Sequence, residues 1–434
     1  MKKLLLLFLA VVGMVSTVSA TDYYIGAEIS SSWGIQGQMT DEDGDGTYSL
    51  IVNLPQQTGM YFTIFTSNSI TWSDAYRPDN TSSPWITNSV HEISMKESNS
   101  NDYSIYYPIG YDDGNKNFAR AIRIDYTPST KKLNVTRLIV VASGYNGWST
   151  TTDYIAETSC GSKIYHGYVT LEVTSAGYDD GFKFNYFNYY NSNVNNDWGA
   201  NNSGKLSNAA SNYIVAADGV YELRADFNTW DWEDPVRVTV SASVGSYGMA
   251  TFSSAYPLDF TGITTVSAYT ITAASNGNLT KTQVTGMVPA NTGLYIEGDV
   301  DASADVPTTI YTGSVGKNML VAAASETKIY QEDGDNTNYI LTVKTIGGDV
   351  DTPKFYRVNG TSGNNVSVGK AYLQIPTASA AREILWFDDD VTAIENLTPA
   401  LNKVEGVVFD LQGRRVMNPT KGLYIVNGKK TIIK

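Results

Sequence analysis

A repeat in the first half of the chain constrains the fold more than any other feature of the sequence. The stretch "YYIGAEISSSWG", which starts at Tyr23, is matched by "RLIVVASGYNGWS", which starts at Arg137. Each is an apolar strand pattern followed by a loop that reaches a tryptophan, and pairs such as "GMYFTIF" and "GFKFNYF" follow in the same order. Short strand patterns that repeat after about 110 residues are typical of tandem β-sandwich domains. We therefore expect an all-β chain with immunoglobulin-like sandwiches at residues 22–136 and 137–240.

The remaining sequence divides into a third strand-rich region and a basic tail. Residues 241–390 show short strand patterns that do not match the repeat, so we expect a further all-β domain there. Residues 391–401 are expected to form a linker. The whole chain has a net charge of −14, whereas residues 402–434 contain seven Lys or Arg against two acidic residues. A segment with its own charge sign and a Gly-punctuated hairpin pattern is predicted to be a small β-module.

The N-terminal segment and the cysteine content indicate where the protein works. Lys2 and Lys3 precede an apolar run of about a dozen residues from Leu4 to Val15, and Val18 and Ala20 lie where small residues precede a cleavage site. This is the pattern of a cleaved signal peptide at residues 1–20. We expect an exported protein, at the outer-membrane surface or extracellular. Cys160 is the only cysteine, so no intramolecular disulfide is expected, and no cysteine follows Ala20 directly, which argues against a lipid anchor. The acidic balance argues against a nucleic-acid partner, because neutralising phosphates requires Lys and Arg clusters.

Catalytic and metal-binding patterns are sparse. Asp41, Asp43 and Asp45 alternate as in a calcium loop, but a strand pattern follows where a calcium hand requires a glutamate. A hairpin turn is therefore the expected structure, with a weak calcium site as the alternative. Two histidines and one cysteine leave little for nucleophilic catalysis, so we expect neither an enzyme nor a cofactor. A glycoside hydrolase stays open, because 44 acidic residues could include a catalytic pair.

Aromatic residues in polar loops are the strongest indication of a binding site. Sugar rings present apolar C–H faces that aromatic rings can contact, while amide and guanidinium groups bind the hydroxyls. The alternative for each ring is packing against a sandwich core. The predicted glycan-binding residues are Trp72, Tyr76, Arg77 and Trp85 in the first repeat, and Tyr189, Tyr190, Trp198 and Asn202 in the second. Two such sites on one chain would act together on a polymer.

Two parts of the chain resemble known families. The strand–loop–Trp opening, the "DGTY" hairpin and the "F-x-x-F" strand of residues 22–240 resemble the carbohydrate-binding modules of SusE/SusF-type outer-membrane starch-binding proteins. That resemblance implies tandem immunoglobulin-like sandwiches that present Trp and Tyr platforms to α-glucan without enzymatic activity. The tail resembles the C-terminal sorting domain of type IX secretion cargo, which implies export. The residues that match its order are Gly413, Arg414, Gly422, Tyr424, Gly428 and Lys434.

Together these patterns predict non-catalytic binding of a glycan at the bacterial cell surface. The glycan is expected to be starch-like α-glucan or another polysaccharide, and outer-membrane glycan-uptake or secretion machinery is a further expected partner. The alternative is a structural or adhesive surface protein that binds a protein or a host glycan. The pattern assigns no role to residues 241–390.

Overall fold

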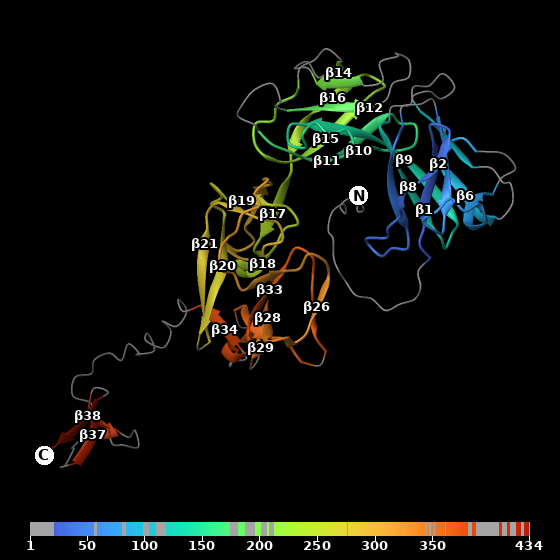
Figure 1. Ribbon diagram of the computed structural model, residues 1–434. Coiled ribbons are helices and arrows are strands. Elements are labelled where there is room, and N and C mark those ends of the chain that lie inside the picture. The colour runs from blue at the N-terminus through green and yellow to red at the C-terminus, as the bar shows by residue number, and fades with distance from the viewer. Residues whose placement is uncertain are drawn as a thin grey trace.

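The structure is a computed structural model, and it confirms the prediction of an all-β protein (Figure 1). The described residues contain 38 β-strands, no α-helix and three short 3-10 helices. The expected signal peptide and linker lie outside the described residues. The description covers residues 21–433 except 56–58, 80–83, 99–103, 110–118, 174–180, 187–195, 201–205, 208–211, 276, 344, 347–348, 351, 361, 381–383, 388–407, 410–414, 417–421 and 427–428.

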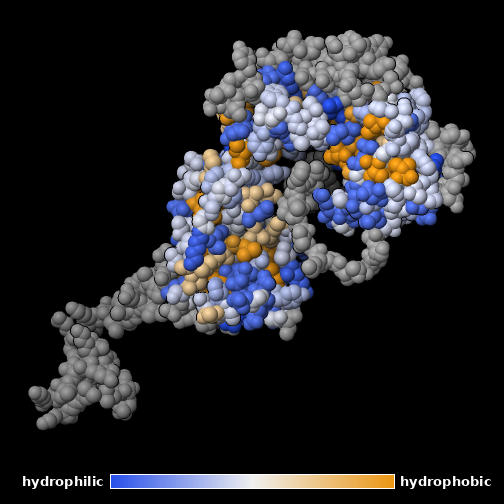
Figure 2. Space-filling model, viewed as in Figure 1, coloured by the Kyte–Doolittle hydropathy of each residue, from blue (hydrophilic) through white to orange (hydrophobic). Residues whose placement is uncertain are grey.

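The surface of the described part is mixed in polarity. Figure 2 shows mostly hydrophilic and neutral residues on the visible face, with apolar patches over the first sandwich and the third region. Within the described ranges, no helix is long and apolar enough to cross a membrane.

The first sandwich packs two layers of strands around one core. One layer has the order β2-β1-β4, with β5 and β7 pairing along the other edge of β4, and the second layer contains β3, β8, β9 and β6. Side chains on a strand alternate between its two faces, and on β8 they send Ile122, Ile124 and Tyr126 into the core. The elements are β1 (Tyr24–Ile29), β2 (Ser32–Gln38), β3 (Tyr48–Asn53), β4 (Gly59–Phe65), η1 (Trp72–Asp74), β5 (Ala75–Pro78), β6 (Glu92–Ser98), β7 (Ile105–Pro108), β8 (Ala121–Thr127) and β9 (Lys132–Ser143).

Strand β9 belongs to both sandwiches. Its first part pairs with β8, where Leu133 lies opposite Tyr126. Its second part pairs with β10 (Tyr154–Glu157) and β12 (Phe182–Tyr186), and there Val140 lies opposite Tyr154. The expected division between residues 136 and 137 therefore falls inside one continuous strand.

Buried contacts join the two sandwiches beside this strand. Arg137 on β9 donates to Glu157 Oε2 at 3.4 Å and to Asn88 Oδ1 at 2.8 Å. The side chains of Arg137 and Glu157 are only 4% and 3% exposed. Gly161 has a φ of +72° and lies against Asn88, where a Cβ would come within 2.3 Å of the Asn88 carbonyl oxygen. The sandwiches are therefore packed against each other at β9.

The second sandwich has fewer strands than the first, and its strands pair in a similar order. Its core includes Phe182, Phe184 and Tyr186 from one strand, together with Trp232. The strands are β10 (Tyr154–Glu157), β11 (Ile164–Leu171), β12 (Phe182–Tyr186), β13 (Asn196–Ala200), β14 (Leu206–Ser207), β15 (Gly219–Asp226) and β16 (Asp231–Arg237).

The third region contains a ten-stranded sheet and several short strand pairs. Three clusters of buried apolar residues form its cores. The elements are β17 (Thr239–Ser243), η2 (Gly245–Tyr247), β18 (Met249–Phe252), β19 (Leu258–Asp259), β20 (Val266–Ser275), β21 (Asn278–Val284), β22 (Met287–Val288), β23 (Leu294–Gly298), β24 (Ser303–Pro307), β25 (Leu320–Ala322), β26 (Thr327–Ile329), β27 (Glu332–Asp333), β28 (Asn336–Thr342), β29 (Thr345–Ile346), β30 (Asp349–Val350), β31 (Lys354–Arg357), β32 (Asn364–Val366), β33 (Ala371–Pro376), η3 (Thr377–Ser379) and β34 (Ile384–Phe387).

The tail forms a four-stranded antiparallel sheet with the order β36-β35-β37-β38. Its strands are β35 (Val408–Phe409), β36 (Arg415–Val416), β37 (Gly422–Val426) and β38 (Lys429–Ile433). Among the described residues, these strands pair only with one another. The sorting role of this segment stays a prediction.

A cluster of tyrosines lies in the core of the first sandwich. The ring centroid of Tyr23 is 4.9 Å from that of Tyr48, 5.9 Å from that of Tyr76 and 5.2 Å from that of Tyr126. Burial is the main cause that raises the pKa of Tyr23, Tyr76 and Tyr126 above the ordinary value of 10.0.

We expect this cluster to make the protein less stable in alkali. A tyrosine with a raised pKa holds its proton more tightly in the folded protein than in the unfolded chain. Its stabilising effect is therefore complete below the unfolded pKa of 10.0 and is lost as the pH rises toward the folded pKa. Denaturant titrations at about pH 8 and about pH 11 should show a lower free energy of unfolding at the higher pH. Tyr126→Phe should reduce that pH dependence, and equal free energies at the two pH values would contradict the expectation.

Candidate functional site

Aromatic side chains gather on the outside of the β2-β1-β4 layer of the first sandwich. On β4, Met60, Phe62 and Ile64 belong to the core. Because side chains alternate along a strand, Tyr61 and Phe65 lie on the opposite, outer face. Residues directly opposite each other on paired strands share a face. The pairing register with β4 therefore also assigns residues of the neighbouring strands to the core side or to the outer face. We call this surface the outer face, and its residues are Trp33, Tyr61, Phe65, Trp72, Arg77, Trp85 and Tyr106.

Three rings on the outer face form a row that crosses β4, β7 and an isolated β-bridge at Trp85. Tyr61 on β4 lies opposite Tyr106 on β7, and Trp85 bridges to Tyr106 from the other edge of β7. The ring centroid of Tyr106 is 4.8 Å from that of Tyr61 and 4.7 Å from that of Trp85, with interplanar angles of 52° and 49°. Trp85 is 49% exposed and Tyr61 is 38% exposed. We call these three residues the aromatic row.

A glycine makes room for the central ring of the row. A Cβ at Gly59 would come within 2.0 Å of the Tyr106 hydroxyl oxygen. The missing side chain therefore lets the Tyr106 ring lie over the backbone of β4. Burial, followed by the neighbouring Tyr61, raises the pKa of Tyr106.

The other part of the outer face centres on Trp72. Its ring centroid lies 4.8 Å from that of Trp33 in an edge-to-face contact and 5.3 Å from that of Phe65. The Arg77 guanidinium carbon lies 4.5 Å from the Trp72 ring centroid, which is a cation–π contact. Phe65 is fully buried over Gly26, where a Cβ would come within 2.3 Å of its ring. Packing on several sides therefore fixes Trp72, which still exposes 38% of its surface.

Tyr76 lies on the core side of its strand, away from the outer face. It stands opposite Ile64 in the register of β4 and β5, and it packs against the core. Its hydroxyl donates to Glu97 Oε1 at 2.7 Å. Of the four residues predicted in the first repeat, the structure thus places Trp72, Arg77 and Trp85 on one face and separates Tyr76 from them.

Similarity to known proteins is slight. No family model matches the chain, and no curated protein matches it. A solved structure that shows some similarity is SusF from Bacteroides thetaiotaomicron, with a TM-score of 0.22 and 12% sequence identity over 67% of this chain and 73% of that chain. A similarity at this TM-score indicates neither a ligand nor a function for this chain.

The predicted site of the second repeat falls mostly outside the described residues. Tyr189, Tyr190 and Asn202 lie there entirely. Trp198 lies on β13, where its backbone pairs with Phe184, and only the backbone of this strand is described. A glycan-binding role for these four residues stays a prediction.

The three aspartates of the calcium prediction come together in a turn before β3. Carboxylate oxygens of Asp41, Asp43 and Asp45 lie within 4.8 Å of one another. Asp41 Oδ2 accepts a hydrogen bond from the Gly46 amide at 3.1 Å, and Asp45 Oδ1 accepts one from the Thr47 amide at 2.8 Å. Such bonds are typical of turns that aspartate side chains stabilise. Calcium binding at this turn stays a prediction.

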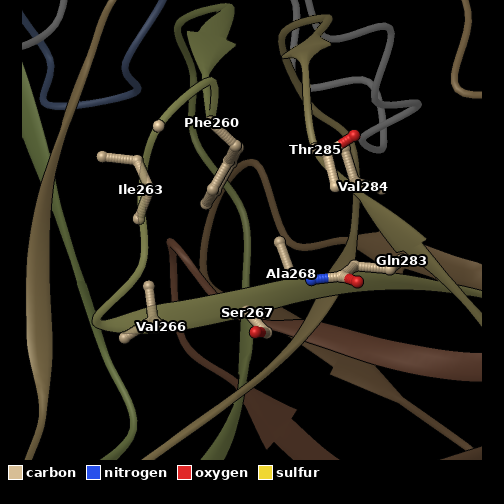
Figure 3. Close-up of a pocket in the computed structure, with 9 residues that line it drawn as sticks. Phe260, Ile263, Val266, Ser267, Ala268, Gln283, Val284 and Thr285 are labelled. Atoms are coloured by element: carbon tan, nitrogen blue, oxygen red, sulfur yellow. The ribbon is translucent and has the colours of Figure 1, made fainter.

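A small pocket in the third region offers little for chemistry. Figure 3 shows Phe260 and Ile263 on one side of it and Val284 and Thr285 on the other. Its volume is about 160 Å³, and its lining contains no ionisable side chain. Pockets for small-molecule ligands usually measure about 300–1,000 Å³, so the outer face remains the stronger candidate.

Two of the three rings in the aromatic row were not among the predicted site residues. The predicted site residues are ones expected in polar loops, whereas Tyr61 and Tyr106 lie within strands. A usable signal was present in "GMYFTIF", where three apolar residues at alternate positions define the core face and leave Tyr61 outside.

Proposed function

We propose that this protein binds a glycan without catalysis, through the outer face of the first sandwich. The observation that carries the proposal is the aromatic row, in which Tyr61, Tyr106 and Trp85 lie side by side at the surface. Tyrosine and tryptophan supply large, rigid contact areas with polar edges. Such rings can contact the apolar faces of sugars while the sugar hydroxyls keep their hydrogen bonds.

The group around Trp72 supports the same proposal. Trp72 is exposed in part. Arg77 is only 7% exposed, and its guanidinium lies against the Trp72 ring. A ring that is fixed before binding loses little conformational freedom when a ligand contacts it. A polymer that reaches both parts of the outer face would gain affinity from the second contact.

The proposed place of action is the outside of a bacterial cell. The signal-peptide pattern of residues 1–20 supports export, and the basic tail supports sorting to the surface. Glycan-uptake or secretion machinery in the outer membrane would then be a neighbour of the protein.

Deleting residues 402–434 is expected to leave glycan binding unchanged and to retain the protein inside the cell envelope. The reason is that strands β35 to β38 form a sheet of their own among the described residues. Cell fractionation and surface labelling would locate the truncated protein, and a binding assay on the purified truncation would provide the control. Surface exposure equal to that of the full chain would contradict the sorting role.

The proposed function is tested by calorimetric titration of the chain with soluble polysaccharides. Starch, xylan, mannan and mucin glycans would form the panel. At least one should bind saturably, Trp85→Ala should weaken that binding, and Trp72→Ala should weaken it less because its ring is more enclosed. Tyr145→Ala, at a ring that is 44% exposed in the second sandwich, is the matched control.

The same titration separates the alternatives. An adhesive or structural protein would bind none of the glycans, and a protein ligand would then be the candidate. Release of reducing sugar from a bound glycan would indicate a hydrolase and would contradict the non-catalytic proposal.

A further inference from the structure

The aromatic row crosses β4, β7 and the isolated β-bridge at Trp85. Tyr61 and Trp85 flank Tyr106 on its two sides. The Tyr106 amide donates to the Pro84 carbonyl and the Tyr106 carbonyl accepts from the Ile86 amide, while Tyr61 lies opposite Tyr106 across the edge shared with β4. The centroid spacings of 4.8 Å and 4.7 Å equal the usual separation of about 4.8 Å between neighbouring strands. The row therefore has a constant step and follows the hydrogen-bonding direction of the sheet.

Successive rings in the row do not share a plane. Tyr61 and Tyr106 are inclined at 52°, and Tyr106 and Trp85 are inclined at 49°. The flat face of an ordered fibre would contact only one of these rings fully. A single chain whose sugars can turn about its axis would be able to contact each ring in turn.

The segments that carry the row are free of charged residues. Residues 59–65, 84–90 and 104–109 contain no Asp, Glu, Lys or Arg. An acidic glycan would lose hydration at these rings and would gain no ion pair from the three segments. The row therefore favours an uncharged ligand.

We infer that the aromatic row binds a single, extended and uncharged polysaccharide chain with equatorial linkages, the class of β-1,4-linked glucans, mannans and xylans. This inference rests on the proposed function and specifies its ligand. An equatorially linked chain runs straight, so consecutive sugars meet consecutive rings. A coiled α-glucan curves away from a straight row after one or two sugars, so it makes fewer contacts.

The test compares oligosaccharides of equal length. Six-sugar β-1,4-linked gluco-, manno- and xylo-oligosaccharides would be titrated into the full chain beside maltohexaose. We expect at least one β-linked ligand to bind about tenfold more tightly than maltohexaose, and its affinity should rise with length from two to six sugars. Trp85→Ala should remove the difference. Gly59→Ala should reduce it, because the added Cβ displaces Tyr106 without removing a ring.

The other outcomes distinguish a wrong ligand class from a wrong function. Maltohexaose binding as tightly as, or more tightly than, every β-linked ligand would overturn the inference while leaving the proposed function in place. Binding to microcrystalline cellulose that exceeds binding to soluble chains would also overturn it. If no glycan binds, the proposed function fails. Light scattering would then test for self-association of the protein. Self-association that is present in the unchanged chain and lost in the Trp85→Ala variant would identify the aromatic row as an interface between copies.

Discussion

Replacing Arg137 with alanine is expected to destabilise the protein by about 3–5 kcal/mol, because the change leaves the Glu157 carboxylate buried without its ion-pair partner. The Arg137 and Glu157 side chains are 4% and 3% exposed, and their charged atoms lie 3.4 Å apart. Burial by itself lowers the pKa of Arg137, but Tyr107 and Glu157 raise it, and the net shift is upward. The guanidinium is therefore charged in the folded protein.

Denaturant unfolding would measure this loss against a matched surface variant. Arg123→Ala removes a pair with Asp125 at 3.0 Å in which the arginine side chain is 36% exposed, so its cost should stay below about 1 kcal/mol. Arg137→Met combined with Glu157→Leu should recover much of the stability, because no buried charge remains. A cost for Arg137→Ala no larger than that for Arg123→Ala would contradict the account of the junction.

Removing the two exposed rings of the aromatic row is expected to cause a large loss of glycan affinity. Tyr61→Ala combined with Trp85→Ala removes both exposed rings of the aromatic row, and exposed aromatic anchors of this kind contribute about 2 kcal/mol or more each. The two rings both contact Tyr106, so their contributions need not add. We expect glycan affinity to fall by at least about thirtyfold, the equivalent of 2 kcal/mol.

Calorimetry on the double variant needs two controls. Tyr145→Ala and Tyr247→Ala remove rings that are each 44% exposed elsewhere on the protein, and they should leave affinity unchanged. The double variant should also keep its melting temperature within a few degrees, because surface substitutions usually change stability by about 0.5 kcal/mol or less. Equal affinity loss in the control variants would show that the row has no special role.

The strands were easier to predict than their arrangement. Alternation such as "AIRIDYT" identifies a half-buried strand from local pattern alone, and the structure confirms the all-β class. The continuity of β9 was not predicted, because the repeat begins again at Arg137 in the middle of the strand. "KLNVTRLIVVAS" contains neither glycine nor proline, so nothing in it marks a turn.

Local sequence pattern also does not show which residues of the candidate site share a face. Arg77 and Tyr76 are neighbours in sequence, but a strand sends neighbouring side chains to opposite faces. Placing Tyr76 on the core side therefore required the register in which it stands opposite Ile64. Tyr106 joins the row only because β7 pairs with β4 across more than forty positions of sequence, a contact that local pattern does not encode.

Hydroxyl-radical footprinting of the full chain, with and without a saturating glycan, tests the central claim most directly. Mass spectrometry would report the oxidation of each exposed ring separately. The account predicts that Trp85 and Tyr61 become protected when the glycan binds, whereas Tyr145 and Tyr247 react as before. Saturating glycan that leaves Trp85 and Tyr61 fully reactive would show that the ligand binds elsewhere, and it would contradict the assignment of the outer face.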